Sequence, residues 1–299
     1  MISHLYGAKH GTSPVSGMDT HTLDFIDNRL NTDTAPQCAL NVVLGADSVS
    51  LLAADASGAM MAFHSRMLAG EETSFDQIEW QLRGILQQET LFGLPFGQIH
   101  CALFNRNATL VPRRLFQHGA LSGYFKLLLN PADYIYAYDE LPEFDAYLVY
   151  ATEPALAKLC TEFFPRSRNR HLAVPLLRNA RQTAANEEHR LFVNFRNQVA
   201  QMAVFERQNL LFYNSFAFSA SSDLLYYVLM LYDQFRLSTQ DTPLIVAGNL
   251  LEDSELYRLL YRFVRDIRFA ELPAFYHLPT DRPTLPGHCY YDLFCLKNL

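Results

Sequence analysis

The sequence is short of charge and contains no long apolar run. Charged residues make up 18% of its 299 residues, against about 25% in an average soluble protein, and the net charge is −7. A chain of net negative charge lacks the positive field that binds nucleic acid or anionic membrane surfaces. Because no run of about 18 apolar residues is present and residues 1–13 lack an apolar core, we expect neither membrane insertion nor a secretory signal. We therefore expect a cytoplasmic protein that does not bind nucleic acid.

Cysteine and histidine do not follow the spacings of metal or redox sites. The five cysteines are odd in number and form no CxxC pair; they are Cys38, Cys101, Cys160, Cys289 and Cys295. Such a set favours buried, reduced thiols in a reducing compartment. The ten histidines show neither HxH nor HExxH spacing. We expect no bound metal and no cofactor.

Apolar and aromatic side chains are abundant. Hydrophobic residues make up 49% of the chain, which includes 22 Phe and 16 Tyr. This content is enough for the core of one large domain or about two ordinary ones. Two expected helices, 221–235 and 254–265, carry tyrosines beside their leucines and are apolar over more than one stripe. A wide apolar surface with aromatic anchors favours contact with a protein partner or self-association.

Two stretches far apart in the sequence each predict three consecutive antiparallel strands. The expected strands are 39–44, 48–54 and 59–65 in the first stretch, and 191–195, 198–205 and 210–218 in the second. An amphipathic helix and a buried strand follow each set, at 75–92 and 97–104 and at 221–235 and 243–247. Aligning Val43 with Asn194, an offset of 151 residues (194 minus 43), matches the two meanders without a gap. The pattern predicts an internal duplication.

The remaining segments alternate between expected strands and helices, which is typical of an α/β fold. The expected elements are a strand at 145–150, a helix at 153–164, a strand at 171–174, a helix at 176–185 and a last possible strand at 289–296. Residues 1–36 are polar with little periodicity and predict a flexible N-terminal arm. We expect a first subdomain at 37–183 and a second at 184–299, which includes the C-terminal tail.

Two such units facing each other resemble the actin-like ATPase superfamily, which has a ribonuclease H-like fold. The stretch NFRNQVAQMAVFERQNLLFYNSF is similar to the second phosphate hairpin of bacterial cell-division and pilus-assembly members. The run 190–270 is similar to an uncharacterised Bacteroidota family with a degenerate actin-like fold. The resemblance covers residues 38–275 and implies a duplicated fold with two βββαβα-type subdomains flanking a cleft.

The phosphate-binding residues that the resemblance implies are mostly replaced. In the superfamily the hairpin glycines let backbone N–H groups approach phosphate, and aspartates orient Mg²⁺ through water. Here the two aspartate positions carry Val43 and Asn194. The motif glycines and threonine of the second copy are replaced by Arg196, Gln198 and Val199, and the double glycine of the adenosine site is reduced to Gly248-Asn249. The residues left for a vestigial nucleotide cleft are Gly45, Ser48, Arg196 and Gly248.

Three hypotheses for the function follow. The first is a scaffold or adaptor with the fold of an ATPase but without its activity, that is, a pseudo-ATPase that is not an enzyme. This hypothesis rests on the degenerate phosphate-binding motifs. The alternative is a nucleotide-binding protein with altered contacts through Gly45, Ser48, Arg196 and Gly248 and little or no hydrolysis. The third is an enzyme of another class, such as a relative of sugar or acetate kinases. That enzyme would need a carboxylate base in the cleft, for which Asp47 is the candidate.

Overall fold

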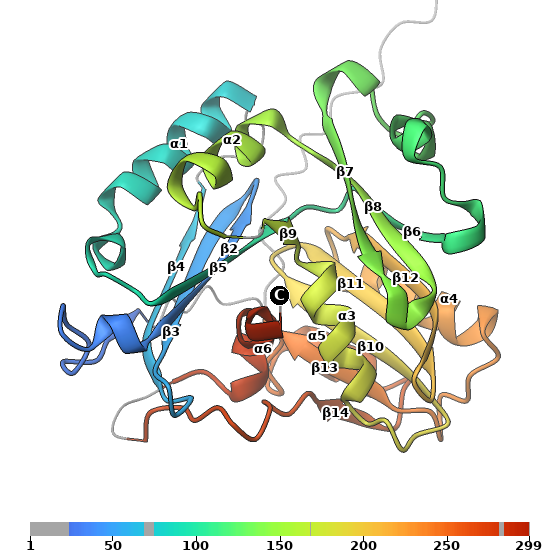
Figure 1. Cartoon of the computed structure of the whole chain (residues 1–299). Coiled ribbons are helices and arrows are strands. Elements are labelled where there is room, and N and C mark those ends of the chain that lie inside the picture. Colours follow the sequence, from blue (N-terminus) through green and yellow to red (C-terminus); the bar gives the residue numbers. More distant parts are fainter. Residues whose placement is uncertain (1–23, 69–74, 168, 281–283, 299) are drawn as a thin grey trace, which may run out of the picture.

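The computed structural model describes residues 24–298 except 69–74, 168 and 281–283 (Figure 1). Most of the expected arm, residues 1–36, lies outside the described residues. Its described end contains the short strand β1 (Phe25–Ile26), which pairs antiparallel with β4 (Met60–Met67). A 3₁₀ turn at Ala35–Gln37 then leads into the first sheet.

The first sheet contains the first predicted meander. Its strand order is β1-β4-β3-β2-β5-β9. The strands not yet given are β2 (Ala39–Gly45), β3 (Ser48–Ala54), β5 (Gln98–Phe104) and β9 (Arg170–His171). β2 pairs antiparallel with β3 and parallel with β5. The central strands are apolar on both faces, as expected of strands covered on both sides.

The second sheet repeats this topology. Its order is β12-β11-β10-β13-β14, with the strands β10 (His189–Arg196), β11 (Val199–Glu206), β12 (Asn209–Ala217), β13 (Leu244–Gly248) and β14 (Ile267–Phe269). β10 pairs antiparallel with β11 and parallel with β13. Val43 is opposite Ser50 in the first hairpin, and Asn194 is opposite Gln201 in the second. Both pairs span seven residues, so the gapless alignment of the two hairpins agrees with their registers.

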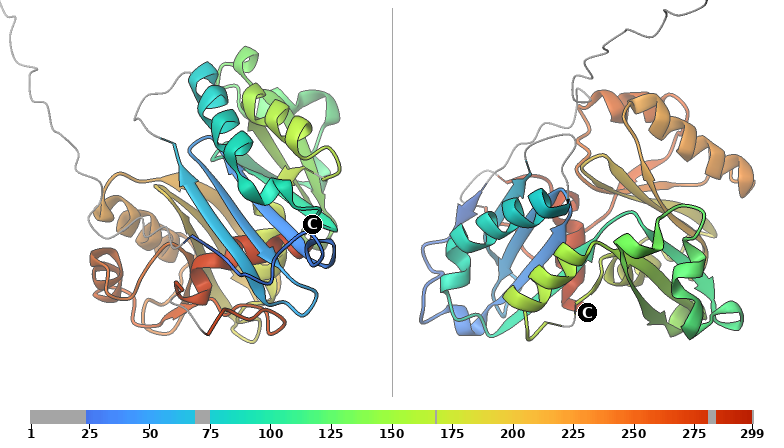
Figure 2. Two further views of the ribbon diagram at one scale, coloured as in Figure 1. Left: turned by 90° about the vertical axis from the view of Figure 1, so that its left-hand side faces the viewer. Right: turned by 90° about the horizontal axis from the view of Figure 1, so that it is seen from above.

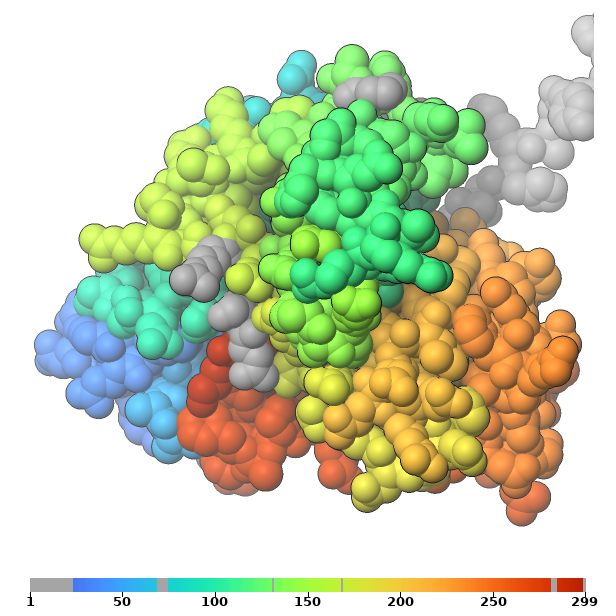
Figure 3. Space-filling view, turned by 45° about the vertical axis from the view of Figure 1, so that its right-hand side comes forward, coloured from blue at the N-terminus to red at the C-terminus, as the bar shows by residue number. Residues whose placement is uncertain are grey.

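In the part of the chain that the structure describes, a third, antiparallel sheet and six α-helices complete the fold. The sheet has the order β6-β8-β7, with β6 (Ala108–Pro112), β7 (Ile135–Leu141) and β8 (Ala146–Thr152). The helices are α1 (Phe75–Gln88), α2 (Pro154–Phe163), α3 (Ala173–Gln182), α4 (Ser221–Gln234), α5 (Glu255–Tyr261) and α6 (Tyr291–Cys295). In Figure 3 the green segment that follows β6 stands above the gold β12. Among the described helices, none is long and apolar enough to cross a membrane.

Two predicted helices are longer than the observed ones. The apolar pattern at 75–92 continues beyond α1 into a separate 3₁₀ turn, Thr90–Gly93, which Glu89 caps by accepting a bond from the Leu91 N–H. The helix predicted at 254–265 ends at Tyr261 in the structure. Leu260 and Val264 are nevertheless buried together in one core cluster. Val264 therefore stays in the core although the chain has left the helix. Because a residue after the helix can be buried as well, apolar spacing alone overestimates the length of a helix.

The helices form layers on the two large sheets. α1 and α2 lie side by side on the outer face of the first sheet, where Leu82 and Leu156 are fully buried (Figures 1 and 2). α4 and α5 cover the outer face of the second sheet, and α3 lies on its inner face. The five cysteines are all buried and free, in line with the expectation of buried thiols, and the Cys101 and Cys160 sulfur atoms are 3.5 Å apart.

The C-terminal segment lies between the two large sheets, where Figure 1 shows α6 in dark red. Leu293 and Phe294 pack on the first sheet, whereas Tyr291 and Cys295 join the core of the second. The prediction of a strand at 289–296 was therefore wrong. A continuous apolar run does not distinguish a strand from a buried helix. A helix sends side chains in all directions, so it can fill a space that has core on both sides.

Candidate functional site

The turns of the two equivalent hairpins are joined by hydrogen bonds. Asn197, in the turn between β10 and β11, has the left-handed φ of 51° that asparagine tolerates better than most residues. Its Nδ2 donates to Oδ2 of Asp47 at 2.6 Å and to Oγ of Ser48 at 3.0 Å. Asp47 lies in the turn between β2 and β3, and Ser48 is the first residue of β3. The two turns that the resemblance assigns to phosphate binding therefore contact each other.

Arg196 adds a buried ion pair next to this contact. Its guanidinium donates one N–H to Oδ2 of Asp292 at 2.9 Å and another to Oγ of Ser50 at 2.9 Å. The Arg196 and Asp292 side chains are 7% and 5% exposed. The guanidinium also lies over the Phe104 ring, 5.6 Å from its centroid. Because Ser50 is on β3 and Asp292 is in α6, Arg196 links the second sheet to the first sheet and to the C-terminal segment.

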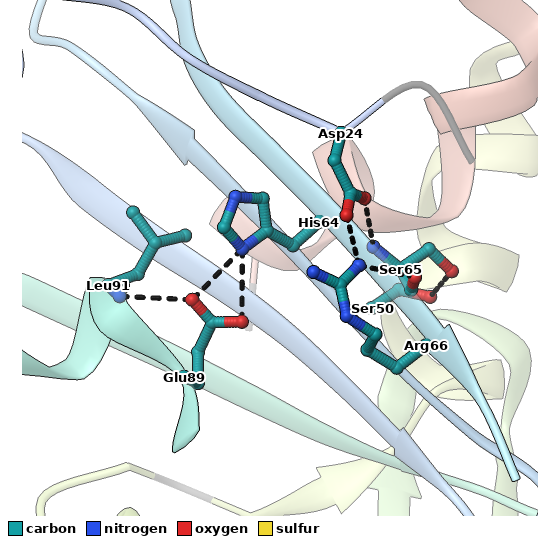
Figure 4. Close-up of polar contacts among 7 residues, drawn as sticks. All are labelled: Asp24, Ser50, His64, Ser65, Arg66, Glu89 and Leu91. Atoms are coloured by element: carbon teal, nitrogen blue, oxygen red, sulfur yellow. Dashed lines mark hydrogen bonds and ion pairs between the residues drawn. The ribbon is translucent and has the colours of Figure 1, made fainter. Parts of the chain in front are cut away.

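Ser50 is itself held by its neighbours on the first sheet. Its hydroxyl lies 3.1 Å from that of Ser65 on β4, as Figure 4 shows. Further along β4, the His64 Nδ1 is 2.9 Å from a Glu89 carboxylate oxygen. Arg66 pairs with Asp24 on the adjoining edge. Ser50 is therefore a fixed acceptor for Arg196.

The structure does not bring all four candidate residues of the vestigial cleft to the same place. Ser48 and Arg196 lie at the contact between the hairpins. A Cβ on Gly45 would meet Oδ1 of Asp47 at 2.8 Å and Cδ1 of Phe104 at 3.4 Å, so Gly45 lies under this contact. Gly248 is on the other side of β10, and a Cβ there would lie 2.0 Å from the Phe195 carbonyl oxygen. The glycines allow close approach of this chain's own backbone and side chains.

The replaced positions are buried among other residues of the protein. Val43 is fully buried in the apolar cluster between β2 and α6. The Asn194 amide donates to Gln201 at 3.1 Å, and Gln201 donates to the Tyr213 hydroxyl at 2.9 Å. Asn194 Oδ1 is buried and has no hydrogen-bond partner. Neither position supplies a carboxylate, so these side chains do not fit the Mg²⁺ shell that the resemblance implies.

Sequence reasoning missed Asp292, Asn197 and Ser50. Asp292 lies in the segment 289–296 that the sequence predicted as a strand, and its partner Arg196 is 96 residues away in sequence. Asn197 did carry a local signal, because asparagine at a two-residue hairpin turn indicates positive φ. Nothing in the sequence shows that its side chain reaches Asp47 across the molecule.

Glu153 is a further buried carboxylate close to the hairpin contact. It precedes α2, is 7% exposed, and its Oε2 has no hydrogen-bond partner. Burial raises the pKa of Glu153. The nearby Asp47 carboxylate also raises this pKa, whereas a hydrogen bond from Asn105 lowers it. Within the described residues, no three His, Cys, Asp or Glu side chains are placed to hold a metal ion.

Glu153→Gln is expected to stabilise the protein at neutral pH by about 1 kcal/mol, because it removes a buried charge without changing shape. The raised pKa means that the folded state binds a proton more tightly than the unfolded state. Wild-type stability should therefore rise as the pH falls through this pKa, and the advantage of Gln should shrink. Urea unfolding of both proteins between about pH 4 and pH 8 measures this difference. A difference that does not depend on pH would contradict the expectation.

Comparisons with known proteins agree with this geometry at the level of fold. A crystal structure of a Bacteroides thetaiotaomicron protein with an actin-like ATPase fold and unknown function is 17% identical, with a TM-score of 0.65. The match covers 81% of this chain and 94% of that chain. A chain of the PilM–PilN type IV pilus biogenesis complex is 12% identical, with a TM-score of 0.60, over 86% of this chain and 97% of that one.

A third structure and a family model extend the comparison. The ethanolamine utilization protein EutJ from Carboxydothermus hydrogenoformans is 10% identical, with a TM-score of 0.50 and coverage of 91% of each chain. No curated protein matches the sequence. A family model described as "Protein of unknown function (DUF3822)" matches residues 27–267. Because this match spans most of the chain, the protein belongs to the DUF3822 family, and its fold is that of the actin-like ATPases.

Proposed function

We propose that this protein is a catalytically inactive actin-like scaffold or adaptor that works in the cytoplasm through protein–protein contacts. The observation that carries the proposal is the direct bonding of the two hairpins through Asn197, Asp47 and Ser48. In a working member of the superfamily these hairpins would hold nucleotide phosphates between them. Here the chain's own side chains take that place.

The charges at this contact also disfavour the binding of a nucleotide. The Arg196 guanidinium lies beside the hairpin contact, and Asp292 already neutralises it. The Asp47 carboxylate faces the same contact. A phosphate would have to displace Asp292, break the Asn197 bonds and approach Asp47, a like charge. Each neutral hydrogen bond that is lost costs about 1 kcal/mol, and a buried bond to a charged group costs more.

A second candidate function rests on Arg196 and its hydroxyl partner. If α6 moves, the Arg196 guanidinium and the Ser48 and Ser50 hydroxyls could contact a phosphate, with Gly45 and Gly248 nearby. This is the nucleotide-binding alternative with little or no hydrolysis. The kinase-like alternative has weaker support, because the Asp47 carboxylate is held by Asn197 and Ser48. A catalytic base needs a carboxylate that is free to take a proton.

Exposed aromatic side chains support the protein-contact part of the proposal. Tyr226 on α4 is 63% exposed and Tyr261 at the end of α5 is 60% exposed. The two helices pack beside each other on the outer face of the second sheet. Tyrosine anchors are common in protein interfaces. One solved structure with this fold, that of PilM and PilN, is itself a complex of two proteins.

We also propose that the chain divides into two lobes at 37–183 and 184–299. The first and second large sheets are formed by strands from 25–171 and 189–269. Residues 291–295 contribute to the cores of both. The C-terminal segment would therefore join the lobes as well as extend the second one.

Titration of the wild-type protein with Mg·ATP tests the proposal. We expect no heat of binding and no change in melting temperature at about 1 mM nucleotide, because the hairpins are already bonded. A ligand present at about 100 times its Kd would stabilise the protein by about 2.7 kcal/mol. A shift of that size in the wild type would contradict the inactive-scaffold proposal, whereas a shift only in Asp292→Asn would support the nucleotide-binding alternative.

Analytical sedimentation tests self-association. The wild type is compared with the variants Tyr226→Ser and Tyr261→Ser, and Trp80→Ser on α1 is the matched control.

A further inference from the structure

A cavity of about 360 Å³ lies under the C-terminal segment at the opposite end of β2 from the hairpin turn. We call it the tail pocket. Its polar lining consists of Gln37, Asn41, Asp55, Gln98 and Lys297, and Phe275 and Tyr276 supply aromatic walls. Its volume is in the range of small-molecule sites, which begins at about 300 Å³. The tail pocket shares no residue with the contact between the hairpins.

Asn41 supplies an unused hydrogen-bond acceptor in this pocket. The side chain is on β2 and the residue is 2% exposed. Its Nδ2 donates to the Leu293 carbonyl of α6 at 2.9 Å, which fixes the orientation of the amide. Oδ1 is buried and has no partner. Because an unsatisfied buried acceptor costs about 1–3 kcal/mol, a donor from a bound molecule would be stabilising here.

The pocket also contains one charge of each sign. Burial raises the pKa of Asp55, but hydrogen bonds from Ser57 and Ala59 and the positive charge of Arg29 hold it below its usual value, so Asp55 is a carboxylate at neutral pH. Those bonds all reach Oδ1. The Lys297 ammonium lies 3.4 Å from the Phe275 ring centroid. Within the described residues, neither Asp55 nor Lys297 forms an ion pair with an oppositely charged side chain.

We propose that the tail pocket binds a small zwitterion of the α-amino acid class. The ammonium group of the ligand binds Asp55 Oδ2 and Asn41 Oδ1, and its carboxylate binds Lys297. Phe275 and Tyr276 pack against its side chain. The opposite charges exclude a purely anionic ligand such as phosphate, because Asp55 would repel it. The proposal is independent of the function proposed above.

Ligand binding in this pocket is coupled to the position of α6. The Asn41 amide contacts the ligand through Oδ1 and the α6 backbone through Nδ2. Lys297 is in the 3₁₀ turn Leu296–Asn298, which directly follows α6. A ligand that orders Asn41 and Lys297 therefore stabilises the C-terminal segment in its place between the sheets. Binding of any molecule to the folded state alone raises stability by mass action.

Calorimetric titration with L-leucine and L-phenylalanine tests the proposal. We expect binding of at least one of these probes to the wild-type protein. N-acetyl-L-leucine, which lacks the ammonium group, and L-leucinamide, which lacks the carboxylate, should each bind at least about tenfold more weakly, as expected for loss of a charge-assisted bond. No binding of either amino acid up to about 10 mM would overturn the proposal.

Two conservative variants and one control locate the site. Lys297→Gln removes the partner of the ligand carboxylate, and Asp55→Asn keeps the acceptor that holds the turn while removing the charge. Both should weaken amino acid binding at least about tenfold. Lys126→Gln, an exposed lysine on another part of the surface, should bind like the wild type. Equal affinity in all four proteins, or a crystal structure with the probe that shows only water on Asn41 Oδ1, would overturn the assignment.

Discussion

Asp292→Ala is expected to destabilise the protein by about 3–5 kcal/mol. The substitution leaves the Arg196 guanidinium buried between the two large sheets without its carboxylate partner. Removal of one member of a buried ion pair costs this much because the remaining charge stays out of water. Urea unfolding at neutral pH measures the loss as a lower midpoint with an unchanged slope.

A double replacement distinguishes the ion pair from simple packing. Arg196→Met together with Asp292→Leu should recover most of the stability, because apolar residues of similar volume often replace a buried pair at little cost. The control is Arg268→Ala, in the half-exposed pair of Arg268 with Glu187, which should lose much less. If Asp292→Ala were no worse than Arg268→Ala, the Arg196 pair would not hold the sheets together.

Gly248→Ala is expected to cost about 3 kcal/mol or more. Gly248 has a φ of 80°, a conformation that alanine rarely adopts. The added methyl group would also lie 2.0 Å from the Phe195 carbonyl oxygen, so β10 and β13 would have to separate. Strained backbone of this kind costs about 1–3 kcal/mol before the clash is counted. Thermal or urea unfolding measures the effect.

The matched control is Gly84→Ala in the middle of α1. A Cβ at Gly84 meets nothing within 4 Å. Alanine is favoured over glycine in a helix by about 1 kcal/mol, so this variant should be slightly more stable than the wild type. If Gly248→Ala were equally harmless, the close approach of β13 to Phe195 would not require glycine. The sequence motif at Gly248 would then need another explanation, such as an adenosine contact.

The elements of the fold could be predicted from local sequence patterns. Short apolar runs separated by turn residues predicted both meanders, and the offset between Val43 and Asn194 agrees with the observed hairpin registers. These features depend on neighbouring residues and on repetition of the same pattern, which a single sequence contains. The segment at 289–296 was predicted as a strand because its apolar run fits either element, and only its place between two cores makes it a helix.

By itself the sequence determined that Val43 and Asn194 offer no carboxylate where the resemblance implies aspartates, because this depends on residue identity alone. The tertiary structure decided what occupies the space between the hairpins. Asn197 reaches Asp47 across 150 residues, and Arg196 reaches Asp292 across 96. Such contacts depend on how two sheets and a C-terminal helix approach each other in space. That approach is set by packing over the whole molecule, which no local pattern encodes.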